Sequence, residues 1–173
     1  MSDSPNSTAP AGEPPTTDSS AESWHDARQR CCSQHLTTGW WTLLVFLTLG
    51  FVLEVLHGFR SGWYLNVDVE TRRLMLRLAH AHGTLLAVLN LVFAGTIVCS
   101  PGWYGSSQAV ASRCLRGSTV LLPAGFILGG VFLQGSDPGW GIALVPAGAV
   151  LLFISVLVTA RAVRRCGVRL PQV

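Results

Sequence analysis

Hydrophobic residues along this chain gather into four long runs that are separated by short polar segments. The runs cover about residues 40–57, 74–98, 115–133 and 140–160. A helix needs roughly 20 mostly apolar residues to cross the hydrocarbon core of a bilayer, and the runs are close to that length. The pattern therefore predicts an all-α membrane protein in which four transmembrane helices form a bundle.

Aromatic residues support the limits of these spans. Tryptophan is enriched where a helix leaves the hydrocarbon core, because its amphipathic ring suits the headgroup region. Most of the tryptophans stand at or just outside a predicted span end: Trp40, Trp41, Trp63, Trp103 and Trp140. Pro123 and Pro146 lie inside the last two spans. Neighbouring helices satisfy the carbonyls that such prolines free, so both residues are compatible with transmembrane helices.

The two ends of the chain differ in composition from the spans. Residues 1–35 are rich in Ser, Thr and Pro with scattered acids, which predicts a disordered polar tail, with a short interfacial helix at residues 24–34. The transmembrane domain is expected at residues 36–162, and residues 163–173 form a basic tail.

The low content of charged residues supports the prediction of a membrane protein. Charged residues make up 12% of the chain, about half the share that is usual in soluble domains. The net charge is +3, and no clustered basic face of the kind used to bind nucleic acid is present in the sequence. The expected partners are the lipid bilayer and either further copies of the chain or a larger membrane complex.

Arginine is unevenly divided between the two sides of the membrane. With four spans, both termini and the loop after the second span share one side. That side carries eight arginines, and the other carries Arg60, Arg72, Arg73 and Arg77. Positive residues favour the cytoplasmic side, so the termini are predicted to lie in the cytoplasm of a bacterial inner membrane.

Ionisable residues gather where the first two spans are joined. Glu54 and His57 end the first span, and His80 and His82 open the second. An ionisable residue inside a membrane span suggests function, because it is costly to leave unpaired. Glu54 and His57 are three residues apart, so their side chains can converge on one ion. If His57 and Arg77 both mark the membrane interface, the helical rise predicts that Glu54 lies level with His80.

The second span carries further polar and small residues. His80 and His82 are two residues apart and point in nearly opposite directions on a helix, so only one of them is expected to face the bundle. Gly83 and Asn90 share a face, which suits close helix packing with an amide as a polar link. Arg77 offers a different interpretation, in which an ion pair with Glu54 fixes the hairpin and no ligand is bound.

The third span adds two features. Gly125 and Gly129 form a small-residue stripe, which allows close helix packing. Gln134, at the end of that span, lies on the same side as the histidines and is a supporting donor for the candidate site.

The segment His80-Ala81-His82-Gly83 resembles the histidine-bearing helices of haem-copper oxidases and NnrS-like membrane proteins. The layout of the whole chain is similar to that of small four-span bacterial inner-membrane proteins. The resemblance implies that His80 or His82 binds haem or copper. The many further histidines of an oxidase core are missing from this chain.

Three functions remain open from the sequence. The first is a haem b or transition-metal site formed by Glu54, His57, His80 and His82. The second is a non-catalytic accessory or assembly subunit in which these residues are structural, and the third is a small oligomeric transporter with Glu54 as its proton-coupled group. A nucleophilic hydrolase is not favoured, since the cysteines fall on the membrane side opposite these histidines.

Overall fold

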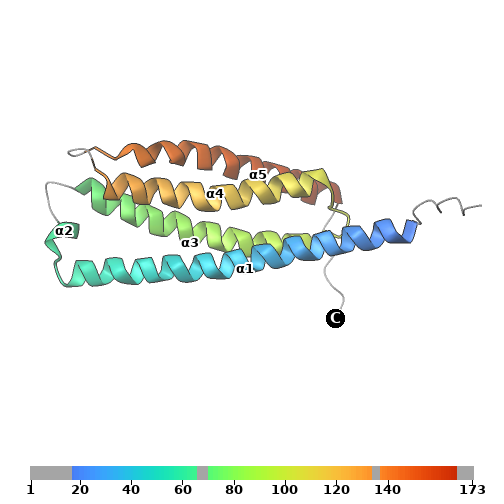
Figure 1. Cartoon of the computed structure of the whole chain (residues 1–173), viewed down its shortest axis with the longest axis horizontal. Helices are drawn as coiled ribbons and strands as arrows, with labels where there is room; N and C mark the ends of the chain where they lie inside the picture. Colours follow the sequence, from blue (N-terminus) through green and yellow to red (C-terminus); the bar gives the residue numbers. More distant parts are fainter. Residues whose placement is uncertain (1–16, 66–69, 134–136, 167–173) are drawn as a thin grey trace, which may run out of the picture.

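The computed structural model describes residues 17–65, 70–133 and 137–166, and in this part of the chain the regular structure is helical. The helices are α1 (Thr17–Gly58), α2 (Gly62–Leu65), α3 (Glu70–Cys99), α4 (Ser106–Val131), the 3-10 helix η2 (Trp140–Ala143) and α5 (Leu144–Cys166). Four of them are long and apolar enough to cross a membrane, namely α1, α3, α4 and the continuous segment from Trp140 to Cys166. The predicted four-helix transmembrane bundle is confirmed (Figure 1).

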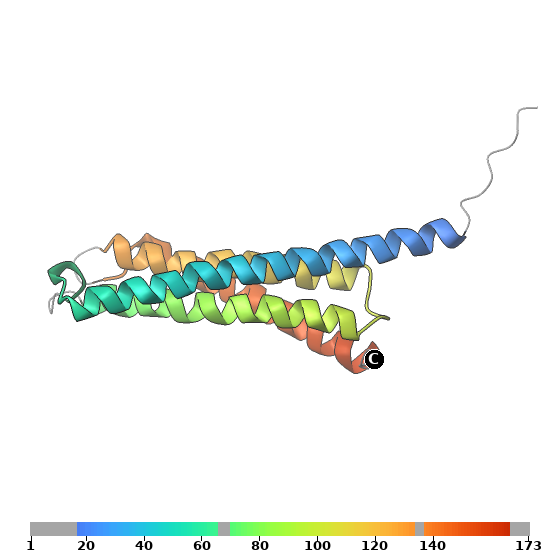
Figure 2. The same ribbon diagram turned by 90° about the horizontal axis from the view of Figure 1, so that it is seen from below.

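Two of the long helices are inner and two are outer. α3 packs against α1 on one side and against α4 on the other, and α5 packs against α4. The views in Figures 1 and 2 show the long helices running side by side. The short helix α2 marks one end of the bundle, which is called the α2 end below. The opposite end carries the start of α1 and the last turns of α5, and is called the terminal end.

α1 is much longer than the predicted first span. It is helical from Thr17 to Gly58, so the helix of the first span begins within the segment 1–35 that was predicted as a polar tail. Residues 24–34 continue directly into the span instead of forming a separate interfacial helix. Residues 1–16 of the predicted tail lie outside the described residues.

A repeating register explains why α1 stays helical and packed. Its most buried residues are His35, Gly39, Phe46 and Leu53, spaced by four or seven residues. Residues at this spacing lie on one face of a helix and form a seam against a neighbour. The seam begins at His35, before the first tryptophan of the span, so the packed part of α1 starts earlier than the hydrophobic run.

α4 also begins earlier than predicted. It starts at Ser106 rather than near residue 115, so Arg113 and Arg116 lie within the helix and not in the preceding loop. Pro123 is accommodated inside α4. A Cβ atom at Gly125 would lie 2.8 Å from Cγ2 of Val145, whereas one at Gly129 would have ordinary contact distances.

The most buried residues of α5 are small. Its buried residues are Gly148, Ser155 and Ala162, which repeat every seven positions. Ser155 donates a hydrogen bond from Oγ to the carbonyl oxygen of Ala111 at 2.8 Å, which ties α5 to α4. The small stripe allows a close approach, and the large apolar side chains of α5, such as Phe153, face outward where the lipid lies.

Candidate functional site

A groove of about 940 Å³ lies between α1 and α3 near the α2 end. Its wall contains Glu54, His57, Arg77 and His80, so the structure brings together three of the four predicted ligand candidates and the predicted supporting arginine. The rest of the wall is mostly apolar and also includes Tyr64 and Arg73, which pairs with Glu70. The groove is therefore an apolar recess with a row of ionisable groups along it.

The depths of these groups differ from the prediction. His80 packs over Gly50, because a Cβ atom placed there would lie 2.4 Å from Cε1 of the imidazole. Gly50 precedes Glu54 by about one helical turn, so Glu54 lies nearer the α2 end than His80 does. The expectation that Glu54 and His80 lie level is wrong. The position of α3 along the axis of α1 is set by side-chain contacts between the two helices. It cannot be calculated from the rise per residue alone.

The orientation of His80 is fixed by the backbone of α1. Its Nδ1 atom lies 2.7 Å from the carbonyl oxygen of Phe46. A carbonyl oxygen only accepts, so Nδ1 carries the proton and donates this bond. In the neutral form of this imidazole, Nε2 is then the nitrogen without a proton. Metal-binding histidines are commonly held in this way, with the second ring nitrogen donating to a carbonyl or carboxylate.

His82 has a similar bond but a different setting. Its Nδ1 donates to the carbonyl oxygen of Leu78 at 2.9 Å, within its own helix. The ring centroid lies 4.9 Å from that of Phe126 on α4. His82 is absent from the wall of the groove, so the structure separates it from Glu54, His57 and His80.

The other predicted groups make few contacts. Glu54, His57 and Arg77 are exposed, and no ion pair joins Glu54 to Arg77 or to any other described residue. The predicted Glu54–Arg77 ion pair is therefore absent from the described structure. Gln134 lies outside the described residues. Within the part that is described, no three His, Cys, Asp or Glu side chains lie close enough to hold a metal ion.

A second group of polar side chains is buried between α1, α3 and α4. The imidazole of His35 is fully buried, with Nδ1 2.7 Å from Oδ1 of Asn90 and Nε2 2.8 Å from Oγ of Ser112. The Asn90 oxygen accepts from Nδ1, so Nε2 accepts from the Ser112 hydroxyl. The Asn90 amide nitrogen donates to Thr119 Oγ1 at 2.9 Å and to the Leu86 carbonyl oxygen at 2.8 Å.

This network involves a histidine that is not one of the candidate ligands His57, His80 and His82. Cys31 Sγ lies 3.6 Å from Ser112 Oγ, so a thiol and a hydroxyl do lie beside a histidine, at His35. The order hydroxyl, imidazole, amide also occurs in enzymes with an activated nucleophile. Here the three groups satisfy one another inside packed helices, and Ser112 is 4% exposed. We therefore assign the network to packing.

Sequence reasoning named Asn90 but missed His35 and Ser112. The signal that could have found His35 is the register of α1. Counting back from Leu53 and Phe46 by seven residues gives Gly39, and one further turn gives His35.

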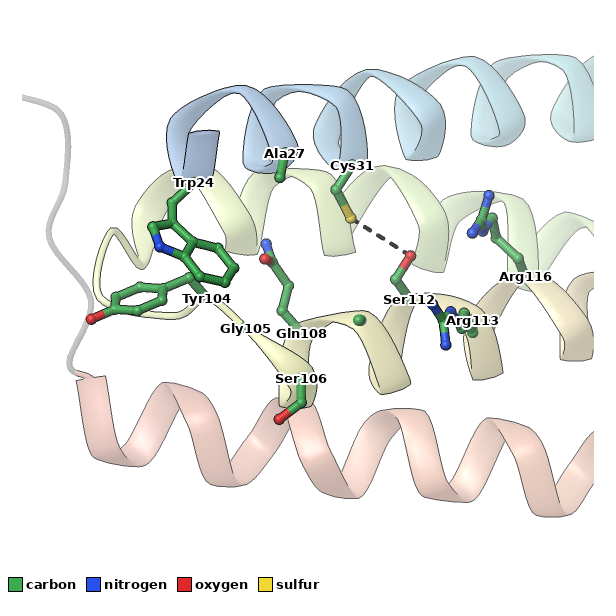
Figure 3. Close-up of a pocket in the computed structure, with 11 residues that line it drawn as sticks. Trp24, Ala27, Cys31, Tyr104, Gly105, Ser106, Gln108, Ser112, Arg113 and Arg116 are labelled. Atoms are coloured by element: carbon green, nitrogen blue, oxygen red, sulfur yellow. Dashed lines mark hydrogen bonds between the residues drawn. The ribbon is translucent and has the colours of Figure 1, made fainter. Parts of the chain in front are cut away.

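A smaller pocket of about 360 Å³ lies at the terminal end, between the start of α1 and the start of α4 (Figure 3). Gln108 projects from α4 toward α1 and ends between Trp24 and Cys31, as the close-up shows. Arg113 and Arg116 also line this pocket. None of these residues belongs to the site that was predicted from the sequence.

Comparison of the chain with protein-family models, with curated proteins and with solved structures finds no match. The functional argument therefore rests on the two recesses and the buried network of this chain alone.

Proposed function

We propose that this integral membrane protein binds haem in the groove between α1 and α3, where His80 would hold the iron. The observation that carries the proposal is the bond from His80 Nδ1 to the Phe46 carbonyl oxygen. With the proton on Nδ1, Nε2 is the ring nitrogen of His80 that can bind haem iron, and His80 lines the groove.

Haem fits the groove better than a bare metal ion does. A bare ion needs several protein ligands, and the described residues offer no such cluster. Haem iron takes four ligands from its own ring and needs only one or two from the protein. His57 also lines the groove and is the candidate for a second ligand.

The charges and the size of the groove support the same ligand. Arginine pairs well with carboxylates, and Arg77 lies in the wall without an ion-pair partner among the described residues. It is about one turn closer to the α2 end than His80, where haem propionates would reach the headgroup region. A volume of about 940 Å³ is at the upper end of the range for small-molecule sites. Bound haem would supply reversible transfer of one electron.

Replacement of His80 by alanine is expected to abolish haem binding. The matched control is His82→Ala, because His82 lies on the same helix and makes the same kind of backbone bond but is outside the groove. Wild-type protein and His82→Ala, produced with added haem and purified in detergent, should both show a Soret band and one haem per chain. His80→Ala should show neither and should still elute as a monodisperse species.

Two results would count against this function. One is wild-type protein that stays free of haem after production with added haem and after titration with haemin. The other is equal loss of the Soret band in His80→Ala and His82→Ala, which would indicate that the band depends on packing of α3 rather than on a ligand.

The orientation in the membrane belongs to the same proposal. Both ends of the described chain lie at the terminal end, together with Arg113, Arg116, Arg164 and Arg165. The larger share of arginine at this end favours the cytoplasmic side of a bacterial inner membrane. The haem groove, at the α2 end, then faces outward.

Cysteine labelling tests this orientation. Cys166 is exposed at the terminal end, so it should resist a membrane-impermeant maleimide in intact cells once the other four cysteines are replaced by alanine. In a cysteine-free chain, Phe59→Cys should label readily, since Phe59 is 83% exposed beyond the end of α1. The opposite labelling pattern would reverse the orientation.

A further inference from the structure

The pocket at the terminal end offers hydrogen-bond donors and no acid. Gln108 is 7% exposed, and its amide nitrogen has no hydrogen-bond partner among the described residues. Nε of Arg116 is likewise buried and unpartnered, while Nη1 of the same guanidinium donates to Oε1 of Gln34 on α1. Arg113 and the hydroxyl of Ser106 are also in the lining, which contains neither Asp nor Glu. Unpaired buried donors are costly, so this pocket favours a ligand that supplies acceptors.

The backbone adds further donors at the same place. α4 begins at Ser106, directly after Gly105, and no side chain caps this end. The first backbone N–H that reaches a helical carbonyl is that of Ala109, which donates to Gly105. The N–H groups of the preceding turn have no acceptor within the helix. The start of a helix attracts anions through these groups and through the helix dipole.

We propose that this pocket binds a phosphate group, held by Gln108 and the start of α4, with the positive charge of Arg113 and Arg116 further along α4. The proposal is independent of haem binding, because the groove lies at the opposite end of the bundle. Phosphate supplies several acceptor oxygens and negative charge, which match the unpartnered donors and the two arginines.

The mouth of the pocket indicates how a phosphate would be presented. The rings of Trp24 and Tyr104 lie there with centroids 6.2 Å apart. Aromatic rings of this kind gather at the headgroup level of a membrane, and basic pockets between helices on the cytoplasmic side bind anionic headgroups. A phosphate that belongs to a lipid and one that is free in solution share the same chemistry at the pocket, so the experiment must distinguish them.

The test measures how added compounds protect detergent-purified, full-length protein against heat. A ligand that binds only the folded state raises the temperature at which half of the monodisperse protein is lost, and titration gives an apparent Kd. The probes are dioctanoyl phosphatidic acid, inorganic phosphate and dioctanoylglycerol, which has the same chains without the phosphate. Phosphatidic acid is expected to protect saturably and dioctanoylglycerol is not. Protection by inorganic phosphate as well would identify free phosphate as a source, and its absence would restrict the site to lipid.

Variants locate the binding. Gln108→Leu should weaken the apparent Kd for phosphatidic acid by about tenfold, the effect of losing one good hydrogen bond to a charged group. Arg116→Met removes a positive charge that lies further from the phosphate, so it should weaken the Kd by a smaller factor. Gln29→Leu and Arg161→Ala change the same residue types at exposed positions outside this pocket and should keep the wild-type Kd. The proposal is overturned if neither phosphate compound protects the wild-type protein or if dioctanoylglycerol protects equally. It is also overturned if Gln108→Leu retains the wild-type Kd.

Discussion

Replacement of Asn90 by leucine is expected to lower the midpoint of thermal unfolding in detergent by about 4–8 °C. Asn90 is fully buried and bonds to His35 on α1 and to Thr119 on α4. Leucine removes the acceptor for His35 Nδ1 and the donor to Thr119. Each polar group left unpaired in the interior costs roughly 1–3 kcal/mol. A total of about 2 kcal/mol corresponds to the stated shift in a chain of this size.

Two further variants test whether the loss comes from the unpaired groups. Thr96→Val removes a hydroxyl of α3 that is exposed and bonds only to the carbonyl of Val92 in its own helix, so its midpoint should stay close to wild type. The double variant His35→Leu, Asn90→Leu removes both partners of the buried bond, and the double change should cost less than the two single changes added together. A wild-type midpoint for Asn90→Leu would contradict a structural role of the network.

The spans and the polar link were predictable because they depend on local composition. Runs of hydrophobic residues identify the four helices without any knowledge of how the helices pack against one another. An amide in the middle of a span is likewise conspicuous, so Asn90 could be named from its position. His35 was not conspicuous, because it lies in a polar stretch before the first span tryptophan. Its role depends on the α1 seam continuing beyond the hydrophobic run, as the buried spacing of Gly39 and Phe46 indicates.

The candidate ligand site was predictable in part for a related reason. The sequence places Glu54, His57 and His80 at one end of a hairpin, and the structure finds all three in one groove. The separation of His82 from this groove follows from helical twist. The depth of His80 along the bundle cannot be obtained by counting residues. It is set by the contacts of the imidazole ring with Gly50 and with the Phe46 carbonyl oxygen on α1. Contacts between helices fix that offset.

The same close packing of α1 against α3 makes Gly83 the position in this contact that is most sensitive to substitution by a larger residue. Gly83 is buried under the ring of Phe46, and a Cβ atom there would lie 2.3 Å from Cγ of that ring. Gly83→Val is therefore expected to push α1 away from α3. Overpacking of a filled interior typically costs about 1–3 kcal/mol, which again predicts a midpoint several degrees lower in the same unfolding assay. His80 would lose its bond to Phe46 in the same displacement, so haem binding should weaken together with stability.

Gly95 provides the matched control on the same helix. A Cβ atom there meets no other atom within 4 Å, so Gly95→Ala removes a flexible residue from a helix without a clash. It should leave the midpoint unchanged or raise it, since alanine favours the helix by up to about 1 kcal/mol. Phe46→Leu should rescue part of the Gly83→Val loss, because leucine removes the ring that the new methyl groups strike. If Gly83→Val and Gly95→Ala had the same midpoint, the close contact between α1 and α3 would not be present in the folded protein.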